Sequence, residues 1–180
     1  MNVVARDSRV LLTTLNWDNF YQHYQWSNSP VLQQEEMATT FPREPVYVFK
    51  QRFEAMMQPD RDARDFEIHT VAGALIGVAY IDWQADPARP CIGLTLCDTT
   101  CRGQGLGRAS LQLLLKVCFS HHSFDHVSAV AHPFQRAWLR LLRQTGFKAS
   151  TPEASPTSFL LSRETHARHP LPSRMTAKAA

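Results

Sequence analysis

A glycine-rich stretch, Arg102–Gly107, has the residue types and spacing in this sequence that could do chemistry. Before it, the apolar run Cys91–Cys97 predicts a short buried strand that ends at Asp98. After it, apolar residues recur at helical spacing and predict a helix that starts near Gly105. A strand, a glycine-rich turn and a helix together present free backbone N–H groups to an anion. The helix dipole stabilises a negative charge at this end by a further ~0.3–1 kcal/mol. This pattern indicates a pyrophosphate site.

The spacing of the turn residues narrows the choice of phosphate ligand. A P-loop needs Gly-Lys-Ser/Thr at its end, whereas this chain has Gly107-Arg108-Ala109. A dinucleotide fingerprint needs a third glycine where this chain has Arg108. The acetyl-CoA signature Q/R-x-x-G-x-G/A does fit, with Arg102, Gly105 and Gly107 at its fixed positions.

Five segments, in chain order, extend this match beyond the turn. They are Tyr24–Val31, Phe66–Ile68, Gly73–Gly77, Ile92–Asp98 and the pair Gly146-Phe147 at the end of a predicted helix. With them the chain resembles the GNAT superfamily of N-acetyltransferases and, within it, the RimJ/RimL-like and polyamine-acetyltransferase-like branch. The resemblance runs from about Arg9 to Arg163.

Hydrophobic patterning and turn residues predict strands interleaved with helices, which is typical of an α/β (α+β) domain. The predicted strands are Val10–Leu15, Phe66–Val71, Leu75–Trp83, Cys91–Cys97, His126–Ala131 and Ser158–Ser162. Predicted helices begin at Asn16, after Pro42 and Pro45, near Gly105 and at Gln135, and we expect loops near Asn28–Pro42 and over Gln58–Asp65. The resemblance implies a mixed, mostly antiparallel sheet flanked by helices and splayed between its fourth and fifth strands.

Length and composition favour one cytoplasmic domain over residues 1–163, followed by a basic, flexible tail over residues 164–180. The four cysteines show neither paired C-x-x-C spacing nor a secreted framework. No apolar run approaches the roughly 20 residues that span a bilayer. The formal charge of +3 is too small to indicate nucleic-acid binding, and the oligomeric state stays open.

The resemblance also implies how acetyl-CoA is held. The fourth strand would lend backbone groups to the pantetheine and thioester, which places Leu96 and Cys97 beside the acetyl group. The turn would bind the pyrophosphate through its N–H groups. Arg102 and Arg108 would either contact the phosphates or stay solvated. Gln135 stands where the family has an asparagine that bonds the pantetheine. The expected cofactor-binding residues are Leu96, Cys97, Arg102, Gly103, Gln104, Gly105, Leu106, Gly107, Arg108 and Gln135.

Two familiar proton-transfer groups of the family are replaced. The usual tyrosine falls on Leu142, and the usual glutamate falls on Cys91 or Ile92. The candidate substitutes are His132, Asp98 and Glu67. A histidine that titrates near neutral pH, or a carboxylate, could move the proton. Each also has a structural interpretation. His132 would simply end a strand, Asp98 would cap the turn, and Glu67 would lie on the solvent face of a half-buried sheet.

We therefore expect an acetyl-CoA-dependent N-acetyltransferase that acts on a primary amine, either a protein N-terminus or a small amine, by direct attack in a ternary complex. The alternative is a non-catalytic CoA-binding or regulatory module. No metal is expected, because the adjacent His121 and His122 would point apart on a helix. Acids in the two expected loops could attract a cationic amine; they are Glu35, Glu36, Asp60, Asp62 and Asp65.

Overall fold

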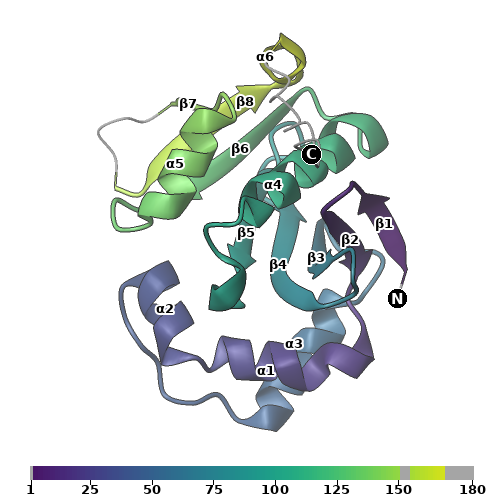
Figure 1. Cartoon of the computed structure of the whole chain (residues 1–180), viewed down its shortest axis with the longest axis vertical. Helices are drawn as coiled ribbons and strands as arrows, with labels where there is room; N and C mark the ends of the chain where they lie inside the picture. The colour runs from purple at the N-terminus through teal and green to yellow at the C-terminus, as the bar shows by residue number, and fades with distance from the viewer. Residues whose placement is uncertain (1, 151–154, 169–180) are drawn as a thin grey trace, which may run out of the picture.

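A computed structural model describes residues 2–150 and 155–168, and its strands form a single sheet in the order β1-β2-β3-β4-β5-β6-β8-β7 (Figure 1). The strands are β1 (Val3–Arg6), β2 (Val10–Thr14), β3 (Ala63–Thr70), β4 (Leu75–Asp82), β5 (Cys91–Leu96), β6 (His126–Ala131), β7 (Lys148–Ala149) and β8 (Thr157–Ser162). The α-helices are α1 (Phe20–Ser27), α2 (Pro30–Met37), α3 (Val46–Met56), α4 (Leu106–Lys116), α5 (Arg136–Gln144) and α6 (Arg163–Arg168).

One junction in this sheet differs from all the others. Neighbouring strands pair antiparallel except β5 and β6, which run parallel and share a single register pair, Cys91 with Ser128. Because no other register pair joins these two strands in the described part of the chain, the sheet opens toward the end of β5. The predicted mixed, mostly antiparallel sheet with a splay between its fourth and fifth predicted strands is confirmed.

Helix α4 covers one face of the sheet and packs against β2 and β5. Its apolar residues recur at helical spacing, so that Leu111, Leu114 and Leu115 are all fully buried. Burying a leucine side chain contributes roughly 1.5–3 kcal/mol relative to leaving it exposed. The helix that begins at the glycine-rich turn is therefore fixed by the main core.

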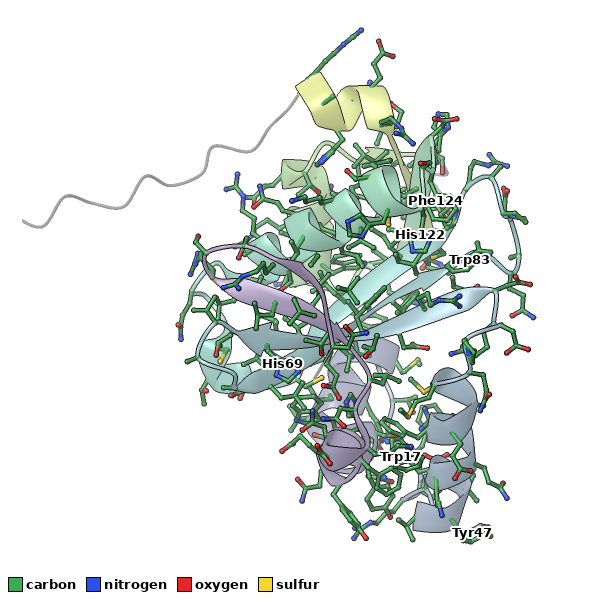
Figure 2. All side chains as sticks on the ribbon, turned by 90° about the vertical axis from the view of Figure 1, so that its right-hand side faces the viewer. Trp17, Tyr47, His69, Trp83, His122 and Phe124 are labelled. Carbon is green, nitrogen blue, oxygen red and sulfur yellow. The ribbon has the colours of Figure 1, made fainter. Side chains whose placement is uncertain are left out.

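A second, aromatic cluster joins α1 and α3 at the other end of the molecule from β7 and β8 (Figure 1). The ring of Phe20 lies 5.4 Å from that of Phe49 and 5.5 Å from that of Phe53, centroid to centroid. Trp17 lies at this helical end in Figure 2, whereas Trp83 lies well away from it. These helices form a layer on the sheet face opposite α4.

The structure adds elements that the sequence patterns did not predict. Strands β1 and β7 were not expected, and α2 lies within Asn28–Pro42, which we expected to be a loop. Only Leu32 of α2 is buried, so this short helix has little apolar periodicity to reveal it. Strand β3 starts at Ala63, inside the expected loop Gln58–Asp65.

The C-terminal segment is also partly different from expectation. Residues 164–168 of the predicted flexible tail belong to α6, and the rest of the tail, residues 169–180, lies outside the described residues. Helix α6 follows β8 directly and packs against it. In the described part of the chain, no helix is both long enough and apolar enough to cross a membrane.

Candidate active site

The glycine-rich turn between β5 and α4 forms a cradle of unpaired backbone N–H groups. Gly103 and Gly105 have φ angles of 74° and 78°, in the left-handed region that glycine adopts without a Cβ clash. The first helical hydrogen bond of α4 runs from the N–H of Ala109 to the carbonyl of Gly105. The N–H groups of residues 104–108 have no hydrogen-bond partner among the described residues. This arrangement is what an anion at a helix N-terminus needs.

Arg9, from the turn between β1 and β2, lies against this cradle. Its guanidinium donates a hydrogen bond to the carbonyl oxygen of Gln104. A Cβ placed on Gly105 would lie 3.0 Å from Arg9 Nη1. Sequence patterns missed Arg9, because it is 95 residues away from Gln104 and belongs to no motif. It adds a positive charge at the position where the sequence predicts phosphate.

Arg102 is held by other protein groups in this structure. Its Nε and Nη2 atoms donate to the carbonyl oxygen of Leu96, at 3.2 and 2.9 Å. Its two terminal nitrogens donate to the carboxylate of Glu35 in α2, each at 2.8 Å. Arg102 therefore connects the end of β5 with α2. Arg108 lies in the first turn of α4 and, like Arg102, is half-buried.

Helix α2 begins with a local cap that places two acids beside the sheet. The Ser29 side chain accepts a hydrogen bond from the N–H of Leu32, and Pro30 occupies the first helical turn. The next residue after Glu35, Glu36, accepts a hydrogen bond from the Thr95 hydroxyl at 2.9 Å. Helix α2 thus reaches β5 at the edge where the sheet opens.

Glu36 also contacts the far side of that opening. The side-chain amide of Gln135, just before α5, donates to the Glu36 carboxylate at 3.1 Å and to its backbone carbonyl at 3.2 Å. The side-chain oxygen of Gln135, Oε1, accepts a hydrogen bond from the backbone N–H of His132 at 2.9 Å. Burial raises the pKa of Glu36, although the bond from Thr95 acts in the opposite direction. A carboxylate therefore bridges the gap between β5 and the start of α5.

The sheet face that carries Thr95 continues toward Tyr80 of β4. Tyr80 pairs with Gly93, and a Cβ on Gly93 would lie 2.5 Å from the tyrosine ring, so the ring covers this glycine. Burial raises the pKa of the Tyr80 hydroxyl, which stays protonated. The side chain is nevertheless 41% exposed. It forms an open, partly apolar surface next to Glu36.

The three predicted proton-transfer candidates have different surroundings. His132 is half-buried, follows the end of β6, and its ring stacks on Phe134 at 5.0 Å. Asp98 caps the turn: its carboxylate accepts from the N–H and the hydroxyl of Thr100, and these bonds lower its pKa. Asp98 therefore caps the turn, which is the structural alternative to a role in proton transfer.

Glu67 is fully buried between the sheet and α1, which differs from the solvent-facing alternative. His23 of α1 and His69 of β3 contact its two oxygens at 3.0 and 2.9 Å. The N–H of Asn16 and the side-chain amide of Asn19 donate to it as well. Burial alone would raise the pKa of Glu67, but these bonds outweigh it and lower the pKa to about 2. The carboxylate is enclosed by protein groups.

The comparisons with known proteins identify the family. A sequence profile of the acetyltransferase (GNAT) domain matches residues 9–148. The chain belongs to the GNAT acetyltransferase family. No curated protein matches the chain.

Solved structures of this GNAT fold resemble the chain over most of its length. Aminoglycoside acetyltransferase AAC(6')-Ib, in complex with coenzyme A, has a TM-score of 0.74 at 17% identity, covering 90% of this chain and 99% of that chain. Spermidine N-acetyltransferase from Vibrio cholerae, in complex with CoA and spermine, has a TM-score of 0.75 at 12% identity, covering 89% and 99%. A putative ribosomal-protein-serine acetyltransferase from Vibrio cholerae has a TM-score of 0.67 at 16% identity, covering 90% and 99%. At these identities the likeness shows the fold.

Two further features of this GNAT domain bear on its chemistry. Cys97 is buried, and burial, together with the nearby charge of Glu36, raises the pKa of its thiol to about 12. The thiol therefore stays protonated near neutral pH and is a poor nucleophile. Among the described residues, no three His, Cys, Asp or Glu side chains are grouped as a metal site would require.

A separate hollow of about 450 Å³ lies over the outer side of α5. It is lined by Pro133, Arg136, Leu139, Arg140, Arg143 and Gln144. None of these residues belongs to β5, to the glycine-rich turn or to α2. We assign no role to this hollow.

Proposed function

We propose that this GNAT protein transfers the acetyl group of acetyl-CoA to a primary amine, a small amine or a protein N-terminus, in a ternary complex. The observation that carries the proposal is the cradle of unpaired N–H groups at residues 104–108, beside a sheet that opens between β5 and β6. A pyrophosphate fits this cradle, because it accepts hydrogen bonds from several N–H groups at once. The placement in the RimJ/RimL-like branch stays a prediction.

The residues near the cradle fit the other parts of acetyl-CoA. Arg9 and Arg108 supply positive charge for its phosphates. To bind the pantetheine amides, Gln135 would exchange its side-chain bonds to Glu36 and His132, and the Leu96 carbonyl would exchange its bonds from Arg102. Acetyl-CoA supplies an activated thioester, and the protein contributes position and hydrogen bonds.

Direct transfer fits the state of the thiol in the site. Because the Cys97 thiol stays protonated, an acetylated cysteine is not favoured as an intermediate. In direct transfer a C–N bond forms and the thioester C–S bond breaks. An ammonium acceptor gives up two protons, one that ends on the leaving sulfur and one that is released to solvent. The structures of an aminoglycoside and a spermidine acetyltransferase, which share the fold, support an amine acceptor.

Calorimetric titration with acetyl-CoA tests this proposal, with Gly105→Ala as the informative variant. Gly105 needs a positive φ and lies against Arg9, so a methyl group there should weaken binding at least about tenfold, or 1.4 kcal/mol. Gly73→Ala is the matched control, because Gly73 has a φ of 89° and an added Cβ meets nothing within 4 Å. Both variants should lose similar stability, roughly 1–2 kcal/mol, but only one should lose affinity.

Two results would contradict the proposal. One is that folded wild-type protein does not bind acetyl-CoA. The other is that Gly105→Ala and Gly73→Ala bind acetyl-CoA equally well. NAD serves as the ligand control, because it has a pyrophosphate but no thioester. Binding of acetyl-CoA without release of CoA in the presence of any amine would favour a non-catalytic CoA-binding module.

A further inference from the structure

Glu36 has an unusual position for a residue of a short surface helix. Its side chain extends from α2 across the opening of the sheet, where Thr95 of β5 and Gln135 before α5 both donate to its carboxylate. These two donors come from opposite sides of the opening. The carboxylate thus lies at the mouth of the gap in which the proposed function places the thioester.

The bonds to Glu36 leave its charge uncompensated. Both of its hydrogen-bond donors are neutral, a hydroxyl and a side-chain amide. Arg102, whose charge acts on the pKa of Glu36, forms its ion pair with Glu35 instead. Among the described residues, Glu36 has no ion pair of its own. A partly buried carboxylate without a cation is stabilised by an incoming cation such as an ammonium group.

The groups around Glu36 connect it with the reacting end of β5. Thr95, which bonds it, immediately precedes Leu96 and Cys97, the residues expected beside the acetyl group. The titratable and charged groups that face it are Glu35 of α2, Arg102 of the turn, Cys97 after β5 and Tyr80 of β4. The Cys97 thiol and the Tyr80 hydroxyl both stay protonated near neutral pH. The Glu35 carboxylate is paired with Arg102, so Glu36 is the carboxylate of this group that lacks an ion pair.

We propose that Glu36 binds the ammonium group of the acceptor and takes the first of its protons. The step moves one proton from the acceptor nitrogen to a carboxylate oxygen, so that a neutral amine and a neutral carboxyl group result. The lone pair exposed on the nitrogen is then free to attack. This role rests on the proposed acetyl transfer and identifies a base that the sequence motifs did not. It replaces Asp98 and Glu67, whose carboxylates are bonded within a turn and within the core.

Glu36→Gln is the variant that tests this role. It keeps the length of the side chain and an oxygen for the Thr95 hydroxyl but removes the negative charge. Glu54→Gln is the matched control, because Glu54 is an exposed acid of α3 that contacts Lys50 and lies outside the proposed site. The probes are acetyl-CoA together with spermidine, kanamycin or a short peptide with a free N-terminus. Calorimetry reports acetyl-CoA affinity separately from turnover.

We expect Glu36→Gln to lower kcat/KM for the amine by about 100-fold or more, which is typical for loss of a general base. Its affinity for acetyl-CoA should change by less than about threefold, since the turn is untouched. In wild-type protein the rate should fall as acid protonates Glu36, at a pH above the ordinary glutamate range because its pKa is raised. This acidic limb should be absent in Glu36→Gln and retained in Glu36→Asp and Glu54→Gln.

The outcomes separate this role from the proposed function. If wild-type protein binds acetyl-CoA and acetylates an amine while Glu36→Gln keeps the same kcat/KM and acidic limb, the role of Glu36 is wrong and the acetyltransferase function stands. If acetyl-CoA binds but none of the three amines is acetylated, the role is likewise contradicted. If wild-type protein does not bind acetyl-CoA, the proposed function fails and the role fails with it.

Discussion

Glu35 and Arg102 form an ion pair with two hydrogen bonds, each of 2.8 Å, between α2 and the glycine-rich turn. The same guanidinium also donates to the carbonyl of Leu96. Three segments that are far apart in the sequence, α2, the end of β5 and the turn, are therefore connected through one side chain. This connection fixes the position of Glu36, which is the next residue along α2.

Arg102→Ala should loosen α2 more than it lowers global stability. The side chains of Arg102 and Glu35 are 35% and 42% exposed, and such pairs contribute roughly 0–1 kcal/mol, so the free energy of unfolding should fall by no more than about 1 kcal/mol. Amide hydrogen exchange across Pro30–Met37 should accelerate. Arg89→Ala is the control, since Arg89 pairs with Asp86 in an exposed turn. Equal exchange rates of α2 in both variants would contradict the connection.

Arg9→Ala should weaken acetyl-CoA binding, because Arg9 places a positive charge against the cradle. We expect a loss of about fivefold at low salt, which shrinks as salt screens the charge. Arg6→Ala, the matched variant, removes an exposed arginine from β1. Calorimetry at two salt concentrations measures both effects. Identical losses in the two variants would show that only net charge matters.

Glu67→Gln should destabilise the protein in a pH-dependent way. The pKa of Glu67 is lowered from 4.5 to about 2, so its ionised form stabilises the fold above about pH 4.5, and this contribution is lost as the pH falls toward 2. A shift of this size corresponds to about 3 kcal/mol. Urea unfolding at about pH 7, 5 and 3 should show the difference between wild type and variant narrowing at the acidic end.

Glu54→Gln is the control for this measurement, because Glu54 lies on the exposed side of α3 and contacts Lys50 at 3.9 Å. Its stability should follow wild type at every pH. A constant difference between Glu67→Gln and wild type from pH 7 to pH 3 would mean that the Glu67 charge does not stabilise the fold.

The parts of the site that the sequence predicted are those encoded locally. Strand β5, the turn and α4 follow one another directly, and each has its own signal: an apolar run, glycines that need positive φ, and apolar residues at helical spacing. Strand β6 was predicted with the bounds that it has, His126–Ala131. Such features depend on neighbouring residues and not on distant contacts.

Helix α2 shows why a local signal can still be missed. Its start is encoded by Ser29 and Pro30, a cap followed by proline in the first turn. Its end is not encoded by glycine, because Ala38 takes the left-handed conformation instead, with a φ of 54°. With a start signal, no clear stop and one buried residue, the segment resembled a loop.

The partners of Arg9 and Glu67 could not be predicted from neighbouring residues. Arg9 lies 95 residues before Gln104, and His23 lies 44 residues before Glu67. Only the folded sheet brings each pair together. The same holds for Glu36, which the sequence identified as one of several loop acids and which the structure alone places between Thr95 and Gln135.

The separation of β5 from β6 has a consequence for solubility as well. An unpaired strand edge is a template on which another chain can add a strand and begin to aggregate. Here that edge lies inside the sheet, and a helix carrying two acids closes it, with Arg102 already bonded to the Leu96 carbonyl. The carboxylates of Glu35 and Glu36 therefore also oppose the addition of a β-strand from another molecule at this edge.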